Sequence, residues 1–232
     1  MPVITFASSK GGPGKTTAAV CLSSAWCSDG KNVAVIDADP TRALSRWCQR
    51  GQQQHTKLGD VHLIECADDE SILETIRSAA ASHDYVLVDC AGAAARLLVY
   101  AAGAADLVVV PAQPGEADLV EAIKTAKIVQ QAADLTGRRI ECRVFLNRMD
   151  PRTHVGRHAI AQIQSQNLIL FESTFGDRVA YREGQYSGTT PILMDPGSPA
   201  AHEIATLARE IDTCITAKSH AVVHETVKSG VR

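Results

Sequence analysis

Short apolar runs alternate with longer helical stretches along nearly the whole chain. Runs such as 85–88 and 107–110 show no alternation of apolar and polar residues, so both faces of the strands they predict should be covered. Covered strands that alternate with helices predict an α/β fold, in which a doubly wound, mostly parallel sheet carries helices on both faces. The predicted strands are 3–8, 32–37, 61–65, 85–89, 106–111, 140–146 and 168–172, and the predicted helices are 15–28, 41–51, 69–82, 94–103, 116–135, 154–166 and 199–217.

The segment after the first predicted strand has the sequence of a phosphate-binding loop. Residues 9–17 read S-K-G-G-P-G-K-T-T and connect strand 3–8 to helix 15–28. The glycines let the backbone turn so that several N–H groups point at one phosphate chain, and the helix N-terminus adds the positive end of its dipole. This pattern predicts a P-loop, with nucleotide contacts from Gly11, Gly12, Pro13, Gly14, Lys15, Thr16 and Thr17.

The loop contains two lysines where one nucleotide needs only one. Lys15 stands where a P-loop lysine reaches the β- and γ-phosphates, and the hydroxyl of Thr16 is placed to bind Mg²⁺. Lys10 opens the loop, and Ser9 replaces the usual first glycine. Because Lys15 already serves the bound nucleotide, Lys10 needs a separate explanation.

Three carboxylates follow predicted strands and are therefore expected at the same edge of the sheet as the loop. Asp37 and Asp39 come after strand 32–37, where one can help to order Mg²⁺ or the loop lysine and the other can orient a water. Asp89 ends the strand 85–89, which is the Walker B position for holding Mg²⁺ directly or through water. Gly92 is a candidate for a flexible turn that senses the γ-phosphate.

A base-reading loop is expected after strand 140–146, where the chain reads Asn147-Arg148-Met149-Asp150. The segment differs from the N-K-x-D guanine motif of GTPases because Arg148 replaces the lysine, whose stem packs along the base. We therefore predict that Asn147, with Arg148 beside it, reads the edge of adenine rather than guanine.

Taken together, these motifs resemble those of the ParA/MinD family of deviant Walker A ATPases. The resemblance rests on the loop that begins at Lys10, on 37–40 (D-A-D-P), on 84–89 (D-Y-V-L-V-D), on Asn147 and on 177–191. It extends from residue 1 to about residue 215. The segment 37–47, with Arg42, Arg46 and Trp47, is in addition similar to ParA-like ATPases of plasmid and T-DNA transfer.

The resemblance implies a mechanism built on ATP, ADP and Mg²⁺. Two protomers would hold two ATP molecules face to face in a homodimer, and Lys10 would cross to the phosphates bound by the partner. Asp39 matches the family residue that positions the attacking water, and Asp37 and Asp89 match those around Mg²⁺, together with Thr16. ATP would make the dimer, and slow hydrolysis, stimulated by a ParB-like or cargo-adaptor protein, would separate it.

Two departures from the family pattern fall in segments that respond to the nucleotide. The usual Asp-Thr-Pro-Pro after the Walker B strand is replaced at 90–92 by Cys-Ala-Gly, and Thr41 replaces the usual glutamine after Asp-Pro. Both changes bear on the rate of hydrolysis and on coupling to partners more than on nucleotide binding.

Composition narrows the choice of partners. The 232 residues suffice for one domain, predicted over 1–217 with a flexible tail at 218–232, and the net charge of −3 argues against a uniformly basic DNA-binding protein. We expect nonspecific DNA to bind a composite surface of the ATP dimer. The seven cysteines include no C-x-x-C pair, and the tail lacks a strong apolar face, which predicts a cytoplasmic protein, on the nucleoid in its ATP state, without a membrane partner. The candidate DNA-binding residues are Lys124, Lys127, Arg152, Arg157, Arg178 and Arg182.

Three functions remain open from the sequence. The first is a ParA-like ATPase that segregates or positions plasmid or chromosomal DNA or a protein cargo. The second is an accessory ATPase or binding module of a DNA-transfer (relaxosome) complex. The third is a MinD-like positioning ATPase on a membrane, for which the tail offers little support.

Overall fold

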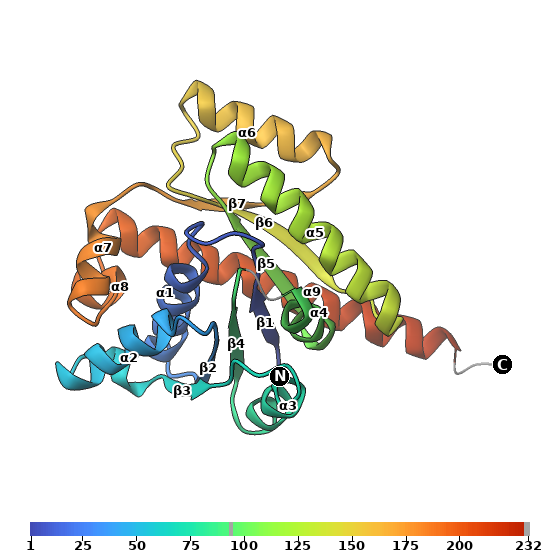
Figure 1. The fold of residues 1–232 in the computed structure, drawn as a ribbon, viewed down its shortest axis with the longest axis horizontal. Helices are drawn as coiled ribbons and strands as arrows, with labels where there is room; N and C mark the ends of the chain where they lie inside the picture. The colour runs from blue at the N-terminus through green and yellow to red at the C-terminus, as the bar shows by residue number, and fades with distance from the viewer. Residues whose placement is uncertain (93–94, 230–232) are drawn as a thin grey trace.

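The computed structural model of the protein describes residues 1–92 and 95–229, which form one seven-stranded sheet with helices on both faces (Figure 1). The strand order is β3-β2-β4-β1-β5-β6-β7, and every neighbouring pair is parallel. The strands are β1 Val3–Phe6, β2 Val33–Ala38, β3 His62–Glu65, β4 Tyr85–Cys90, β5 Leu107–Ala112, β6 Glu141–Asn147 and β7 Ile169–Phe175. The helices are α1 Lys15–Ser28, α2 Ala43–Gln53, the 3-10 helix η1 Lys57–Asp60, α3 Ile72–Ser82, α4 Ala95–Ala104, α5 Glu116–Thr136, α6 His154–Ser165, α7 Val179–Tyr186, α8 Pro191–Met194 and α9 Pro199–Ser229.

The sheet separates two hydrophobic layers because alternate side chains of each strand point to opposite faces. In β1, Val3 belongs to the layer under α3, α4, α5 and α6, whereas Ile4 and Phe6 belong to the layer under α1, α2, α7 and α9. The central strands are buried on both sides, which explains why their sequences lack apolar and polar alternation.

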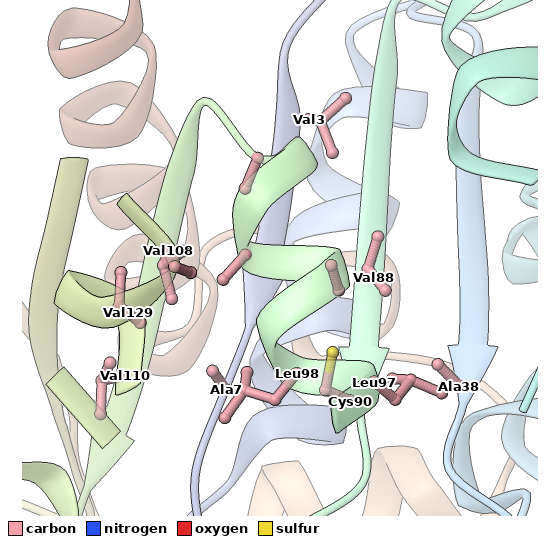
Figure 2. Close-up of a cluster of buried hydrophobic side chains, with 14 of the residues drawn as sticks. Val3, Ala7, Ala38, Val88, Cys90, Leu97, Leu98, Val108, Val110 and Val129 are labelled. Carbon is pink, nitrogen blue, oxygen red and sulfur yellow. The ribbon is translucent and has the colours of Figure 1, made fainter. Parts of the chain in front are cut away.

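Figure 2 shows part of the first layer, in which α4 lies over β1, β4 and β5. Leu97 and Leu98 of α4 pack beside Val88 and Cys90 of β4, all of them at most 2% exposed. Burying a leucine of this kind contributes roughly 1.5–3 kcal/mol. Cys90, one of the departures from the family pattern, is thus a core residue whose thiol faces α4, on the side of the sheet opposite Asp89.

The prediction of an α/β fold with a mostly parallel, doubly wound sheet is confirmed, and all seven predicted strands are present. Several predicted ends were wrong: α2 begins at Ala43, α3 begins at Ile72, β7 continues to Phe175, and α9 continues to Ser229 instead of stopping at 217. The short helices η1, α7 and α8 were not predicted. Residue 94, predicted as the start of a helix, lies outside the described residues, as do the last residues of the predicted tail, 230–232.

The strand order brings the predicted motifs together. β1 lies beside β4, and β4 lies beside β2, so that Asp89 is in register with Phe6 on one side and with Asp37 on the other. The loop after β1 and the acidic segments after β2 and β4 therefore meet at the carboxyl edge of the sheet. No helix in the described part of the chain is long and apolar enough to cross a membrane.

Candidate functional site: a nucleotide-binding edge with two lysines

The loop between β1 and α1 adopts the backbone conformation that its glycines predict. Gly12 and Gly14 have φ angles of 92° and 108°, a region that residues with a side chain rarely enter. A Cβ atom on Gly14 would lie 2.0 Å from the Nδ2 atom of Asn147, so no side chain fits there. Gly14 is also the N-cap of α1, which begins at Lys15 and directs its N-terminus at the loop.

Lys15, Thr16 and Asp89 form the centre of the site. The Thr16 hydroxyl donates a hydrogen bond of 2.6 Å to Oδ2 of Asp89. Lys15 is 6% exposed, and its ammonium donates to the carbonyl oxygen of Lys10 at 3.2 Å, across the loop that is expected to hold the phosphates. The structure therefore places the P-loop lysine, the P-loop hydroxyl and the Walker B carboxylate within one small volume.

Asp37 and Asp39 connect this centre to α2. Oδ2 of the buried Asp37 accepts hydrogen bonds from the backbone N–H and the hydroxyl of Ser45, at 2.8 and 2.6 Å. Oδ1 of Asp37 accepts from the N–H of Asp39 at 3.2 Å, and Oδ1 of Asp39 accepts from the N–H of Thr41 at 2.8 Å. A change at either carboxylate is thus transmitted directly to the first turn of α2.

The oxygen atoms of Thr16, Asp37 and Asp89 suit Mg²⁺, which prefers oxygen ligands and usually combines one or two carboxylates with substrate phosphates. Oδ1 of Asp89 is buried and has no hydrogen-bond partner in the described part of the chain, which leaves it available to a cation or to a water bound to one. Burial raises the pKa of Asp89 to about 7, while the Thr16 hydroxyl and the Lys15 ammonium act in the opposite direction. These residues fit a Mg²⁺ ion that arrives with its nucleotide.

We expect the substitution Asp89→Asn to stabilise the nucleotide-free protein at alkaline pH. The pKa of Asp89 in the folded protein lies above its value near 4 in the unfolded chain, so the wild type loses stability as the pH rises from about 4 to about 7. Asparagine carries no charge and removes this loss, which amounts to a few kcal/mol at most. Urea unfolding at several pH values measures the difference between the two proteins, with Asp29→Asn as an exposed control. A difference that does not grow between pH 4 and pH 7 would contradict the assignment.

Lys10 lies at the rim of the site and is held by the first turns of α5. Its ammonium forms an ion pair of 2.8 Å with Oδ2 of Asp118, and 42% of the Lys10 side chain is exposed. The neighbouring Ser9 donates to Glu121 at 2.7 Å and accepts nothing from the loop itself, and its N–H donates to the hydroxyl of Thr125 at 3.0 Å. Sequence reasoning missed these α5 residues. The acidic first turn after the strand beside β1 was the available signal.

Asn147 lies next to the loop, but its amide is engaged within the protein. Nδ2 donates to the carbonyl oxygen of Pro13 at 2.9 Å, and Oδ1 accepts from the N–H of Arg148 at 3.0 Å. The adenine-reading role stays a prediction. Asn147 and Arg148 line a cleft beside the loop, together with Gly12, Gly14, Thr17, Gly176, Asp177, Arg178, Tyr181, Arg182 and Gln185.

The far wall of this cleft is held by a single carboxylate from α9. Glu203 accepts hydrogen bonds from the N–H of Gly176 at 3.1 Å, the Nε of Arg178 at 2.8 Å and the hydroxyl of Tyr181 at 2.8 Å. The segment 176–181, part of the late stretch that supported the family resemblance, is therefore ordered before any nucleotide binds.

Gly92 contacts the loop from the Walker B side. A Cβ atom on Gly92 would lie 2.8 Å from the carbonyl carbon of Lys10 and 3.2 Å from the nitrogen of Gly11. Only glycine allows this approach, and it places the segment after β4 where a γ-phosphate at the loop would be felt. The sensing role of Gly92 stays a prediction.

The six candidate DNA-binding residues lie on three separate elements, and most of their charges are compensated. Arg178 pairs with Glu203 at 2.7 Å and Arg182 with Asp177 at 3.0 Å. Lys124 pairs with Glu121 at 2.7 Å, as does Arg152 with Asp150 at 2.9 Å. The guanidinium of Arg152 lowers the pKa of Asp150 to about 2, which keeps that pair charged on both sides. Lys127 on α5 and Arg157 on α6 are exposed.

A parallel sheet of this order, with a glycine loop that carries both Lys10 and Lys15, defines a P-loop ATPase of the deviant Walker A type. A family model described as VirC1 protein matches residues 1–225. The chain belongs to this family, within the ParA/MinD group of ATPases.

Two relatives and one solved structure illustrate the match. The protein ParA of Rhizobium radiobacter is 31% identical over 185 residues, covering 78% of this chain and 81% of the relative. The maintenance of carboxysome distribution protein A of Halothiobacillus neapolitanus is 25% identical over 215 residues, covering 90% and 95%. The septum site-determining protein MinD of Pyrococcus horikoshii, solved with Mg-ADP, shares the fold with a TM-score of 0.73 at 21% identity, covering 91% and 96%.

Proposed function

We propose that this protein is an ATPase that dimerises on ATP, binds DNA nonspecifically in that state, and segregates or positions DNA or a protein cargo. The observation that carries the proposal is the position of Lys10. Its ammonium lies at the exposed rim of the phosphate loop, whereas Lys15 is already buried under the same loop. A second lysine in that place fits the phosphates of a nucleotide held by a partner subunit.

The ion pair between Lys10 and Asp118 must open for Lys10 to act on a partner. The pair is partly exposed, and exposed pairs of this kind stabilise a protein by only about 0–1 kcal/mol. The concentrated negative charge of a triphosphate is a stronger attraction for the lysine. The pair therefore holds Lys10 in place in the monomer without opposing dimerisation strongly.

Hydrolysis requires an oriented water and charge stabilisation at the γ-phosphate. We assign the water to Asp39, whose Oδ2 is not used in the contact with Thr41, and the charge to Lys15 and Lys10. Bound Mg²⁺ would neutralise phosphate charge, held by Thr16, Asp37 and Asp89. Loss of the γ-phosphate would remove the attraction for Lys10 and separate the dimer.

The membership of the VirC1 family favours one further candidate, an accessory ATPase of a DNA-transfer complex. Such a protein would recognise a relaxase or a specific DNA sequence. Its DNA binding would then depend on sequence and not on ATP. A ParB-like or cargo-adaptor protein is the partner expected for the first candidate, and a relaxase is the partner expected for the second.

We expect the ATP-bound protein to bind duplex DNA of arbitrary sequence, with an affinity that falls steeply as salt increases. The ADP-bound protein should bind at least about tenfold more weakly, since a monomer presents half of the phosphate contacts of a dimer. Fluorescence anisotropy with labelled duplexes of unrelated sequence measures both. Binding that is confined to one sequence and equal in ATP and ADP would instead support the transfer candidate.

A further inference from the structure

Helix α2 presents a row of arginine and glutamine side chains on the face opposite its buried stripe. Leu44, Trp47 and Cys48 face the core and are at most 1% exposed. At 100° per residue, the opposite face collects every third or fourth residue. Those residues are Arg42, Arg46, Gln49, Arg50 and Gln53. We call this set the α2 arginine face.

The charge of this face is of one sign. Every charged residue between Asp39 and Asp60 is basic, in a protein whose net charge is −3. Arg42 forms an exposed ion pair of 3.1 Å with Glu65. No ion pair involves Arg46 or Arg50 in the described part of the chain. Their contacts are with backbone oxygens: Arg46 donates to Thr41, and Arg50 donates to Gln185 at 3.1 Å.

The contrast with the other basic residues is informative. Lys124, Arg152, Arg178 and Arg182 each have an acidic partner within about hydrogen-bond distance. A phosphate would have to displace that partner. Arg46 and Arg50 can accept a phosphate without breaking an ion pair, and the glutamines beside them can donate further hydrogen bonds.

The helix that carries this face is fixed at both ends. The indole N–H of Trp47 donates to the carbonyl oxygen of Thr189 at 2.9 Å, and the hydroxyl of Thr56 donates to that of Gly188 at 2.6 Å. A Cβ atom on Gly188 would lie 2.4 Å from the nitrogen of Gly51, so the two segments touch through their backbones. At its other end, α2 is bonded through Ser45 to Asp37.

We propose that the α2 arginine face binds the backbone phosphates of duplex DNA. Arg46 and Arg50 are about 6 Å apart along the helix axis, which matches phosphates one or two nucleotides apart on one strand, where the axial spacing is about 3.4 Å per nucleotide. The proposal rests on the DNA-binding function proposed above and assigns it to a surface. Because α2 begins at the carboxylates around the nucleotide, this surface is also the part of the fold best placed to couple DNA contact to the nucleotide state.

The test compares two variants that lose the same charge on different faces. Arg46→Gln/Arg50→Gln removes two charges from α2, and Lys124→Gln/Lys127→Gln removes two from α5. Anisotropy with a labelled duplex and ATP, over a series of KCl concentrations, gives the affinity and its salt dependence. We expect the α2 variant to bind about tenfold or more weakly and its salt slope to fall by about 2, one for each lost phosphate contact. The α5 variant should keep the affinity and slope of the wild type.

Two controls keep the result interpretable. Binding of a fluorescent ATP analogue and the thermal unfolding temperature should be unchanged in both variants. If the loss of the Arg50 contact with Gln185 destabilises the double variant, Arg46→Gln alone should still lower the salt slope by about 1.

The outcomes separate the two proposals. An α2 variant that binds DNA like the wild type, or an equal loss in both variants, overturns the assignment to α2 and leaves the DNA-binding function standing. A wild type that binds no duplex DNA at low salt with ATP overturns both.

Discussion

Replacing Lys15 by alanine is expected to weaken ATP binding by about 100-fold or more. The Lys15 ammonium is buried beneath the loop and is the side-chain cation nearest to where its own nucleotide would bind, and a charge-assisted contact of this type contributes roughly 1.5–3 kcal/mol. Two phosphates share the lysine, so the loss should lie at or above the upper end of that range. Titration with a fluorescent ATP analogue measures the change.

The matched control for this prediction is Lys31→Ala, which removes an exposed lysine just beyond the C-terminal end of α1. Its ATP affinity should equal that of the wild type. Removing Lys15 also removes a charge that lowers the pKa of Asp89, so circular dichroism must show that the variant is folded. An affinity within about threefold of the wild type in folded Lys15→Ala protein would contradict the placement of the nucleotide.

The substitution Lys10→Ala is expected to have a different effect. The variant should bind ATP as a monomer with near wild-type affinity, because Lys10 points away from its own loop toward Asp118. It should fail to dimerise, and its hydrolysis should fall by about 10²–10³-fold, the usual cost of removing one preorganised charged donor from a transition state. Steady-state ATPase assays and sedimentation with ATP measure these two losses.

Asp118→Asn separates the two roles of Lys10. This variant breaks the same ion pair but keeps the lysine, so dimerisation and hydrolysis should persist. If the ion pair itself were what mattered, the two variants would behave alike, and the role of Lys10 toward a partner subunit would be refuted.

The fold followed from the sequence because the strand signal was local and strong. Runs such as 107–110 have only buried positions, and a loop with three glycines fixes where β1 ends and α1 begins. The short helices α7 and α8 were missed because each is too brief to show a helical period. The strand order depends on contacts between distant segments, which no local pattern reports.

The parts of the site that were missed are likewise those made by distant residues. Asp118 and Thr125 hold Lys10 and Ser9 across more than a hundred positions of sequence, and Glu203 orders Arg178 from the last helix. The candidate DNA-binding arginines were chosen by residue type alone. The structure shows that their charges are largely paired, whereas Arg46, noted only for its family resemblance, has no acidic partner among the described residues.

The two departures from the family pattern differ in consequence. Cys90 lies in the hydrophobic layer under α4, where burial raises the pKa of its thiol, so its replacement of the usual residue concerns packing (Figure 2). Thr41 lies in the site itself, where its N–H donates to Asp39 and its carbonyl oxygen accepts from Arg46. The change at 41 is therefore the one that connects hydrolysis to the α2 arginine face.

The central claim is that ATP state and assembly state are one variable, joined by Lys10. Sedimentation velocity of Asp39→Ala protein tests it most directly, because this variant should bind ATP without hydrolysing it. We predict a dimer with ATP, a monomer with ADP, and a monomer with either nucleotide once Lys10→Ala is added. Asp39→Ala protein that stays monomeric with saturating ATP, or a double variant that still dimerises, would contradict the account.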